Sequence, residues 1–310
     1  MVGRGRQLAA ASALAALLSA CSLPTTQPSA ATPTLSAVAP KPTAAPKPTA
    51  TPKPTTTPKR TPKARRSASP TVPEPTVQPA VLRAPKGACT TPPKAVLHAV
   101  PGASGKKVAL TFDDGPGPTA TLKILAILKK NHIGATFFET GEAVSEHPEL
   151  VRAVVAEGSL VGNHTYHHYL PKTGGAFDGL SPAVIAAEVD SASQQIVAAG
   201  GGFPCFFRAP GGHDVSATMR SIVRARGMTA VNWTYDPRDW AAPAKPSPAY
   251  QKHIVAYATG TALHPIVLDH DGPGSDYRGN TVAAVQRIID YYAGRGYTFT
   301  DPLGRPLPSR

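Results

Sequence analysis

Residues 107–118, which read KVALTFDDGPGP, constrain the fold of this chain more than any other stretch. An apolar run ends there in two adjacent carboxylates, Asp113 and Asp114, and a Gly-Pro turn follows directly. A buried strand that delivers two like charges to the edge of a core is costly, because burial and repulsion both disfavour the ionised forms. A bound cation would offset that cost. The stretch therefore predicts a strand that ends at a metal site, with further ligands supplied from elsewhere in the chain.

Short apolar runs alternate with amphipathic runs through the rest of the sequence, which favours a parallel α/β sheet or barrel. We expect strands over residues 106–116, 134–138, 159–163, 203–207, 229–235, 265–268 and 297–300. We expect helices over residues 119–131, 148–158, 182–200, 217–227, 249–259 and 281–295. The chemically reactive residues follow these strands, at the edge where active sites of α/β folds collect: Asp113, Asp114, His164, Arg208, Asp239 and His270.

Two histidines are the first candidates for the missing ligands. His164 and His168 lie four residues apart in GNHTYHHY, so a single helical turn would place both imidazoles on one face, about 5–6 Å apart at Cβ. Two imidazoles and one carboxylate make a three-ligand site with an open position, which is the catalytic pattern. A histidine pair alone is often a surface or core feature. Together with the FDDG strand end, it indicates a metal site.

The net charge of the chain is concentrated in its N-terminal part. The formal charge is +13 over 310 residues, but from Cys89 onward 20 basic and 18 acidic residues nearly balance. The basic excess is therefore no argument for a nucleic-acid-binding fold. The roughly 220 residues after Cys89 suffice for one α/β domain with its own core, which we assign to residues 89–310.

Residues 22–88 form a Pro/Thr/Ala/Lys-rich segment that contains 16 of the 35 prolines, ten Lys or Arg, and one acid, Glu74. With so few large apolar residues it cannot bury a core, so we expect a disordered linker. Dense proline favours polyproline II, at about 3.1 Å per residue, which suits a spacer that reaches into a cell wall. Its positive charge suits contact with anionic wall polymers, the alternative being a solvated linker with no partner.

Residues 1–21 have the pattern of a targeting segment. Arg4 and Arg6 precede an apolar run at 8–18 that is too short for a confident membrane span. The run ends in LSAC at Cys21, which resembles a bacterial lipobox, in which the Cys is lipidated and becomes the mature N-terminus. We therefore expect a lipid anchor that holds the protein on the outer face of the membrane. The alternative is an ordinary secretory signal with a chance Cys.

Five segments, in order, resemble the motifs of the polysaccharide deacetylase family, which is carbohydrate esterase family 4 with its NodB-homology domain: TFDDGP, HTYHH, RAPGG, DPRDW and LDHDG. The resemblance covers about residues 106–302. It implies a distorted, incomplete (β/α) barrel, usually of seven strands. It also implies a metal-dependent enzyme that removes acetyl groups from N-acetylglucosamine polymers such as peptidoglycan and chitin, or from acetylated xylan.

Carried over to this sequence, the family motifs give the strand-end residues separate roles. Asp114, His164 and His168 would bind the metal; we expect Zn²⁺, although Co²⁺, Ni²⁺ or Fe²⁺ also suit this donor set. Iron oxygenases with two histidines and a carboxylate begin with an H-x-D pair, which this order lacks. Asp113 would be the general base for the attacking water, and His270 the general acid for the leaving nitrogen.

The remaining motif residues would support this pair. Arg208 would hold Asp113 ionised, and Asp239 would hold His270 protonated, each through an opposite charge. The acetyl pocket and its oxyanion donor would come from three further residues: Trp240 and Leu268 as walls and the backbone N–H of Gly211 as donor.

Three positions depart from the family pattern. The third motif is RAPGG at 208–212 where R-P-P-x-G is usual, so a pocket side chain is lost. Asp269 stands where an apolar residue is common, and with Asp271 it flanks His270. These two carboxylates either raise the pKa of His270 or, on the simpler interpretation, face solvent. Glu139 replaces a small or apolar residue and is expected to be exposed.

Two cysteines remain if Cys21 is lipidated. Cys89 opens the domain, and Cys205 precedes the RAPGG motif. In an oxidising compartment we predict a disulfide between them, the alternative being two unpaired thiols.

The sequence therefore predicts a lipid-anchored, extracytoplasmic, metal-dependent N-deacetylase whose substrate is peptidoglycan, because that polymer lies within reach of the anchor and spacer. One alternative is a deacetylase or esterase of xylan, chitin or an exopolysaccharide. Another is a non-catalytic wall-binding lipoprotein with the same fold. No nucleic-acid partner is expected.

Overall fold

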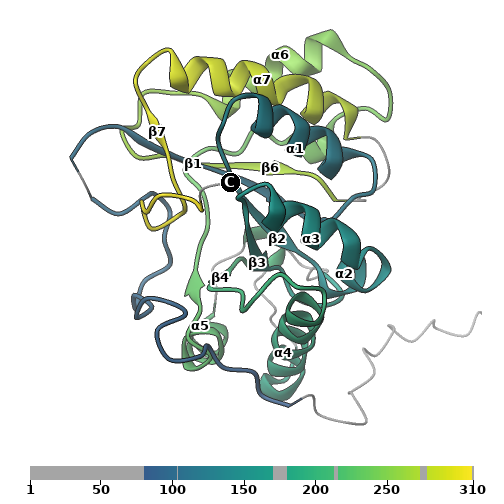
Figure 1. Ribbon diagram of the computed structural model, residues 1–310, viewed down its shortest axis with the longest axis vertical. Helices are drawn as coiled ribbons and strands as arrows, with labels where there is room; N and C mark the ends of the chain where they lie inside the picture. The colour runs from purple at the N-terminus through teal and green to yellow at the C-terminus, as the bar shows by residue number, and fades with distance from the viewer. Residues whose placement is uncertain (1–79, 103, 170–179, 213–215, 273–277, 309–310) are drawn as a thin grey trace, which may run out of the picture. The chain divides into compact units, whose positions relative to one another are not determined.

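The computed structural model describes residues 80–308, except residue 103 and the segments 170–179, 213–215 and 273–277 (Figure 1). The expected signal segment, the lipidation site Cys21 and the linker up to residue 79 lie outside the described residues. Residues 80–88, which the sequence assigned to the linker, contact the folded domain. The Ala84 N–H donates to the Arg226 carbonyl, and Arg83 donates to that of Ala225.

Within the described residues, seven strands form one sheet, and all of the pairs between these strands are parallel. The spatial order is β5-β4-β3-β2-β1-β6, with β7 also pairing with β1. Tyr235, after β5, makes an isolated bridge to Val267 of β6, so the sheet curls without a continuous ladder between its end strands. This is the expected distorted, incomplete (β/α) barrel. The strands are β1 Lys107–Asp113, β2 Thr136–Glu139, β3 Leu160–Asn163, β4 Phe206–Phe207, β5 Thr229–Ala230, β6 Ile266–His270 and β7 Thr298–Phe299.

The helices group on the outside of the sheet. Figure 1 shows α1, α6 and α7 together beside β1 and β6, and α2, α3 and α4 beside β2 and β3. Their bounds are α1 Ala120–Lys130, α2 Gly141–Glu146, α3 Pro148–Ala156, α4 Pro182–Ala198, α5 Ala217–Ala225, α6 Pro248–Ala258 and α7 Gly279–Ala293. Within the described residues, no helix combines the length and hydropathy that a membrane crossing requires.

Local sequence explains where the helices begin and which face they bury. Helix α1 buries Ile124, Leu125 and Leu128 and exposes its lysines, but it also exposes the apolar side chain of Leu122. Helices α4 and α6 begin with Pro after Ser181 and Ser247, whose side chains accept a hydrogen bond from the first turn. The predicted helices and strands exist, and their bounds differ by a few residues.

Two elements differ from the expectation. The strand expected over 229–235 is the two-residue β5, because the backbone beyond it has other partners. The carbonyls of Val231 and Asn232 accept hydrogen bonds from the Arg208 guanidinium, which removes acceptors that a longer ladder would use. Helix α2 was missed because six residues are too few for an apolar periodicity.

The register of the sheet brings the reactive strand ends together. β1 lies between β2 and β6, and Asp113 pairs with Phe138 on one side and His270 on the other. Asn163, which ends β3, pairs with Glu139 and with Phe207. The residues that directly follow these strands therefore emerge at one edge of the sheet.

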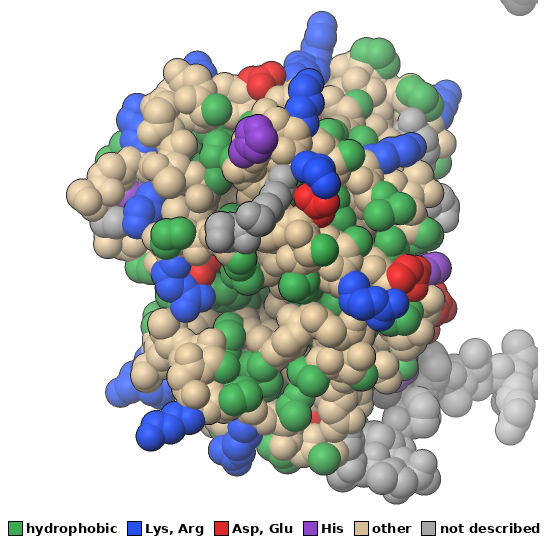
Figure 2. Space-filling view, in the orientation of Figure 1, with side chains coloured by type: hydrophobic (Ala, Val, Ile, Leu, Met, Phe, Trp, Pro, Cys, Tyr) green, Lys and Arg blue, Asp and Glu red, His purple; other side chains and the backbone are tan. Residues whose placement is uncertain are grey.

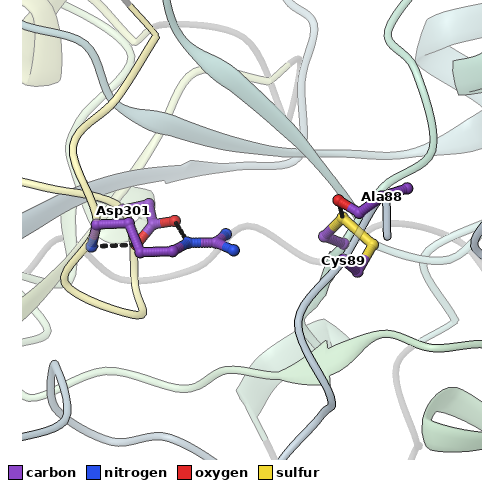
Figure 3. Close-up of a disulfide and its surroundings, with 5 residues drawn as sticks. Ala88, Cys89 and Asp301 are labelled. Carbon is purple, nitrogen blue, oxygen red and sulfur yellow. Dashed lines mark hydrogen bonds and ion pairs between the residues drawn. A yellow bond between two sulfur atoms is a disulfide. The ribbon is translucent and has the colours of Figure 1, made fainter. Parts of the chain in front are cut away.

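A disulfide ties the start of the domain to the segment before β4. Cys89 and Cys205 are bonded with an S–S distance of 1.98 Å and a Cα–Cα distance of 5.4 Å (Figure 3). This is the predicted pairing. Figure 3 also shows Asp301, whose carboxylate accepts hydrogen bonds from the backbone N–H and the Nε of Arg305 in the C-terminal segment.

Candidate metal centre and active site

Three side chains from two loops converge at the carboxyl edge of the sheet. Asp114, His164 and His168 each offer one donor atom, and these atoms lie within 4.8 Å of one another. The Nε2 atoms of His164 and His168 lie 3.4 Å and 3.1 Å from Asp114 Oδ1. That buried oxygen has no hydrogen-bond partner among the described residues. Two imidazoles around such a carboxylate fit a divalent transition metal, so the structure brings together the predicted ligand set.

Hydrogen bonding fixes the orientation of His164. Its Nδ1 lies 2.8 Å from the carbonyl oxygen of Arg208. Because a carbonyl oxygen only accepts, Nδ1 carries the proton and the lone pair of Nε2 faces Asp114. A histidine oriented in this way is ready to coordinate a cation.

The expected helical turn between the two histidines is wrong. Residues 164–168 form a loop in which Thr165 and His168 adopt left-handed backbone angles, with φ of 67° and 52°. This loop still brings the His164 and His168 rings to 4.9 Å between centroids. The spacing thus predicted the right neighbours through the wrong local structure.

Glu188 of α4 holds this loop in place. Its Oε2 accepts the backbone N–H groups of Tyr166 and His167 at 3.1 Å and 2.8 Å, and its Oε1 lies 2.7 Å from His167 Nδ1. The Glu188 side chain is almost fully buried. These three contacts with one carboxylate hold the loop in the conformation that requires left-handed backbone angles at Thr165 and His168. The sequence analysis missed Glu188, because nothing in its helical spacing indicates a contact with the histidine loop.

The predicted base and its partner form a buried ion pair. Arg208 Nη1 donates to Asp113 Oδ1 at 2.7 Å and to the Thr111 hydroxyl at 2.8 Å. Both side chains are almost inaccessible to solvent. Burial lowers the pKa of Arg208, while the Asp113 carboxylate opposes that change and keeps the guanidinium charged. The other oxygen of Asp113 lies 3.7 Å from His164 Nε2, which places it beside the metal ligands.

The predicted acid also has its expected partner. His270 Nδ1 lies 2.6 Å from Asp239 Oδ1, and Asp239 Oδ2 accepts the His270 N–H and the Thr281 hydroxyl. Burial alone lowers the pKa of His270, but Asp239, with Asp114 and Asp113, raises it to about 9. A raised pKa favours the protonated imidazole, whose Nε2 would then be the proton donor that general-acid chemistry needs.

The remaining acids near the site are buried, so the expectation of exposed side chains is wrong. Glu139 and Asp271 have no accessible surface, and Asp269 is 2 % exposed. These residues stand on or directly after β2 and β6, strands that have neighbours and helices over them. Burial raises the pKa of all three, with nearby carboxylates adding to the effect for Glu139 and Asp269. A Cβ at Gly115 would collide with the carboxylates of Glu139 and Asp271, which explains glycine in the FDDG turn.

Two of the predicted pocket residues, Trp240 and Leu268, lie on the elements that carry Asp239 and His270. Trp240 follows Asp239 in the 3₁₀ helix Asp239–Ala241 and is half exposed, whereas Leu268 of β6 is buried. Gly211 adopts φ of 68° in the 3₁₀ turn Pro210–Gly212, a left-handed conformation that favours glycine. Their roles as pocket walls and oxyanion donor stay predictions.

Arg278 is a further site residue that the sequence analysis missed. Its Nη2 lies 3.3 Å from Asp114 Oδ2, and its Nε donates to the Gly272 carbonyl. Arg278 precedes α7, on the loop after β6, so the rule that functional residues follow strands is the signal that indicates it.

The surroundings of Asp114 favour its ionised form. Burial raises the pKa of Asp114, but His164, His168 and His270 outweigh burial and lower this pKa well below its usual value.

Comparisons with known proteins agree with this geometry. The family model for polysaccharide deacetylase matches residues 101–231. A chitooligosaccharide deacetylase from Bradyrhizobium sp. is 35% identical over 213 residues, which cover 66% of this chain and 90% of that protein. The chain belongs to the polysaccharide deacetylase family.

Further members of the polysaccharide deacetylase family match over similar lengths. A peptidoglycan-N-acetylglucosamine deacetylase from Bacillus cereus is 36% identical over 195 residues, covering 63% of this chain and 85% of that protein. Among solved structures, a family 4 carbohydrate esterase from Streptomyces lividans, in complex with acetate, aligns with a TM-score of 0.56 and 33% identity. That alignment covers 67% of this chain and all of the esterase. The half-barrel fold and the deacetylase family thus agree with the sequence motifs.

Proposed function

We propose that this chain is a metal-dependent hydrolase that removes N-acetyl groups from peptidoglycan, at N-acetylglucosamine or N-acetylmuramic acid. The observation that carries the proposal is the Asp-His-His donor set beside the buried Asp113 carboxylate, together with His270 hydrogen-bonded to Asp239. Peptidoglycan is favoured because one relative is named for that substrate and because the expected anchor would hold the protein at the wall.

The chain's own residues divide the reaction between them. Asp114, His164 and His168 would hold the metal, Zn²⁺ by expectation, which polarises the acetyl carbonyl and makes water a better nucleophile at neutral pH. Asp113, which is ion-paired with Arg208, takes the proton of the attacking water. His270 then donates its proton to the amide nitrogen as the C–N bond breaks, which releases acetate and leaves an amine.

The proposed location of the protein rests on its N-terminal sequence. In this proposal, Cys21 carries a lipid anchor on the outer face of the membrane, and the Pro-rich linker carries the catalytic domain into the wall. Figure 2 shows Lys and Arg side chains at several places on one face of the domain, whereas the excess positive charge of the sequence lies in the linker, so contact with anionic wall polymers is assigned to the linker. Incorporation of radiolabelled palmitate should vanish in Cys21→Ala, and persistent labelling would refute lipidation at that site.

The decisive experiment measures acetate release from purified peptidoglycan and from chito-oligosaccharides. We expect release that stops when a chelator is added, returns with Zn²⁺, and is lost in Asp113→Asn. Release from acetylated xylan or chitin without release from peptidoglycan would favour a deacetylase of another glycan. An absence of chelator-sensitive release from every acetylated glycan would favour a non-catalytic wall-binding lipoprotein.

A further inference from the structure

Two exposed aromatic rings lie on the side of the domain that carries the predicted acid. Of the large apolar side chains that are exposed among the described residues, only Trp240 and Tyr257 are aromatic, with exposed fractions of 50% and 58%. Trp240 directly follows Asp239, which is hydrogen-bonded to His270, and Tyr257 lies in α6. Exposed aromatic side chains are typical of surfaces that bind a partner.

A continuous series of contacts joins these two rings. The guanidinium of Arg238 lies over the Trp240 ring, 5.4 Å from its centroid, and the Arg238 carbonyl accepts the Tyr250 hydroxyl at 2.9 Å. On α6, the His253 ring lies 5.0 Å from the Tyr250 ring and 4.3 Å from the Tyr257 ring, between centroids. We call these five residues the aromatic track. It begins beside the predicted catalytic acid and ends on the exposed surface of α6.

Helical spacing explains the part of the aromatic track on α6. Tyr250, His253 and Tyr257 follow one another at intervals of three and four residues, so they share one side of the helix. At about 1.5 Å per residue, this side extends about 10 Å along the helix axis. Ile254 and Ala258 of the same helix are buried in the core, which fixes the orientation of α6 and keeps Tyr257 in solvent.

The link between Trp240 and α6 is held in an unfavourable backbone conformation. Arg238 has a φ of 54°, in the left-handed region that a residue with a long side chain rarely adopts. Its N–H donates to Asp236 Oδ1, and its carbonyl accepts the Tyr250 hydroxyl, so contacts on both sides hold this conformation. Residues held in this way cluster at ligand-binding sites, which favours a binding role for the track.

We propose that the aromatic track is an extended subsite that stacks a sugar unit of the glycan chain beyond the unit at the metal centre. A pyranose ring presents C–H groups on its faces and hydroxyls at its edge. The faces stack on the aromatic rings, and the hydroxyls accept hydrogen bonds from exposed donors such as Arg238. Because His253 packs against Tyr257, little conformational entropy is lost when that ring binds a sugar.

The inference rests on the proposed deacetylase function and deepens it. A ligand that contacts both Trp240 and Tyr257 must be longer than the single unit that is deacetylated. The substrate is therefore a polymer of pyranose sugars, and the track makes the enzyme prefer long chains over short fragments.

The test compares two lengths of one glycan on the full, metal-loaded chain. The substrates are a disaccharide and a hexasaccharide from peptidoglycan glycan strands, with a second pair from chitin. The measured quantity is the ratio of kcat/KM for the hexasaccharide over the disaccharide. In Tyr257→Ala this ratio should fall about two- to tenfold, the range for one aromatic contact, and Tyr257→Phe should keep it because the ring remains. The matched control is Leu263→Ala, an apolar side chain of similar exposure outside the track, which should keep the wild-type ratio.

Each other outcome overturns a stated part of the proposal. An unchanged ratio in Tyr257→Ala, or an equal fall in Leu263→Ala, refutes the subsite while the deacetylase function stands. A fall in Tyr257→Phe as large as that in Tyr257→Ala refutes the stacking. If sedimentation shows that Tyr257→Ala changes the oligomeric state and the ratio stays the same, the track joins copies of this chain and binds no glycan.

Failure of the proposed function gives a different result. If no fragment of either glycan is hydrolysed, the proposed function fails. Calorimetric binding of the hexasaccharides to wild type and Tyr257→Ala then decides the subsite. Weaker binding to the variant supports it, and equal affinities refute it.

Discussion

The pair of His270 and Asp239 allows the sharpest quantitative test of the proposed chemistry. Burial by itself lowers the pKa of His270, and the carboxylate 2.6 Å from its Nδ1 reverses that effect and raises the pKa to about 9. Against a reference pKa of about 6.5, this corresponds to roughly 3 kcal/mol in favour of the protonated imidazole. Asp239→Asn keeps an acceptor oxygen and removes the charge. We expect the pKa of His270 to fall well below the wild-type value in this variant, because only Asp114 and Asp113 then oppose the effect of burial.

The sign of the stability effect follows from the same pKa values. Because the pKa of His270 is higher in the folded than in the unfolded protein, the pair of His270 and Asp239 stabilises the native state fully below about pH 6.5. This contribution is lost as the pH rises through about 9. The stability difference between wild type and Asp239→Asn should therefore narrow by as much as roughly 3 kcal/mol over that interval. Urea unfolding at several pH values measures it.

The direct assay is NMR titration of the labelled imidazoles in metal-free protein, because a bound cation would itself lower the pKa of His270. The matched control is Asp236→Asn, which removes a charge from the same loop but not from the hydrogen bond to His270. In the metal-loaded Asp239→Asn variant, His270 should lose its proton at a lower pH. The variant should therefore have a lower kcat than wild type on the alkaline side of the pH profile. A wild-type His270 that titrates near 6.5, or one that still titrates near 9 in Asp239→Asn, would refute the reasoning.

Three further perturbations test the surroundings of the site. Arg208→Ala should cost about 3–5 kcal/mol of unfolding free energy, because it leaves Asp113 buried without a counter-charge; a loss below 1 kcal/mol in urea unfolding would contradict this. Glu188→Ala should weaken metal binding roughly 10- to 100-fold in chelator competition, because the histidine loop loses its three contacts with Glu188. Glu188→Gln should recover part of this loss. An affinity for the metal equal to that of wild type would show that Glu188 has no effect on the ligands. Cys205→Ser opens a loop with a sequence separation of 116 and should cost about 4–5 kcal/mol; two alkylatable thiols in unreduced wild type would contradict the bond.

The functional residues were predictable from sequence where two local signals coincide. Asp113 and Asp114 end an apolar run, and His164 and His168 share a ligand spacing, so residue type and position indicate a metal site together. The disulfide followed from the two cysteines that are left if Cys21 is lipidated. The arrangement of strands was also predictable, because alternating apolar and amphipathic runs admit few topologies.

Contacts that no motif or residue count indicates were missed. Glu188 reaches the site through the packing of α4 and carries no local pattern, and Arg278 had only its place on the loop after β6 to indicate it. The burial of Glu139, Asp269 and Asp271 was missed for the same reason. Exposure depends on which neighbours cover a strand end, and a charged residue type alone favours the wrong answer.

The sequence alone determined which atoms would do the chemistry, since carboxylates, imidazoles and a guanidinium in fixed order carry their donor and proton properties with them. The tertiary structure decided how those atoms are tuned. The loop at 164–168 is held by Glu188 in place of the expected helical turn, and Asp239 is buried against His270, which raises the pKa of that imidazole. Spacing along a chain is local, whereas desolvation and opposite charge depend on what the fold places within a few ångströms.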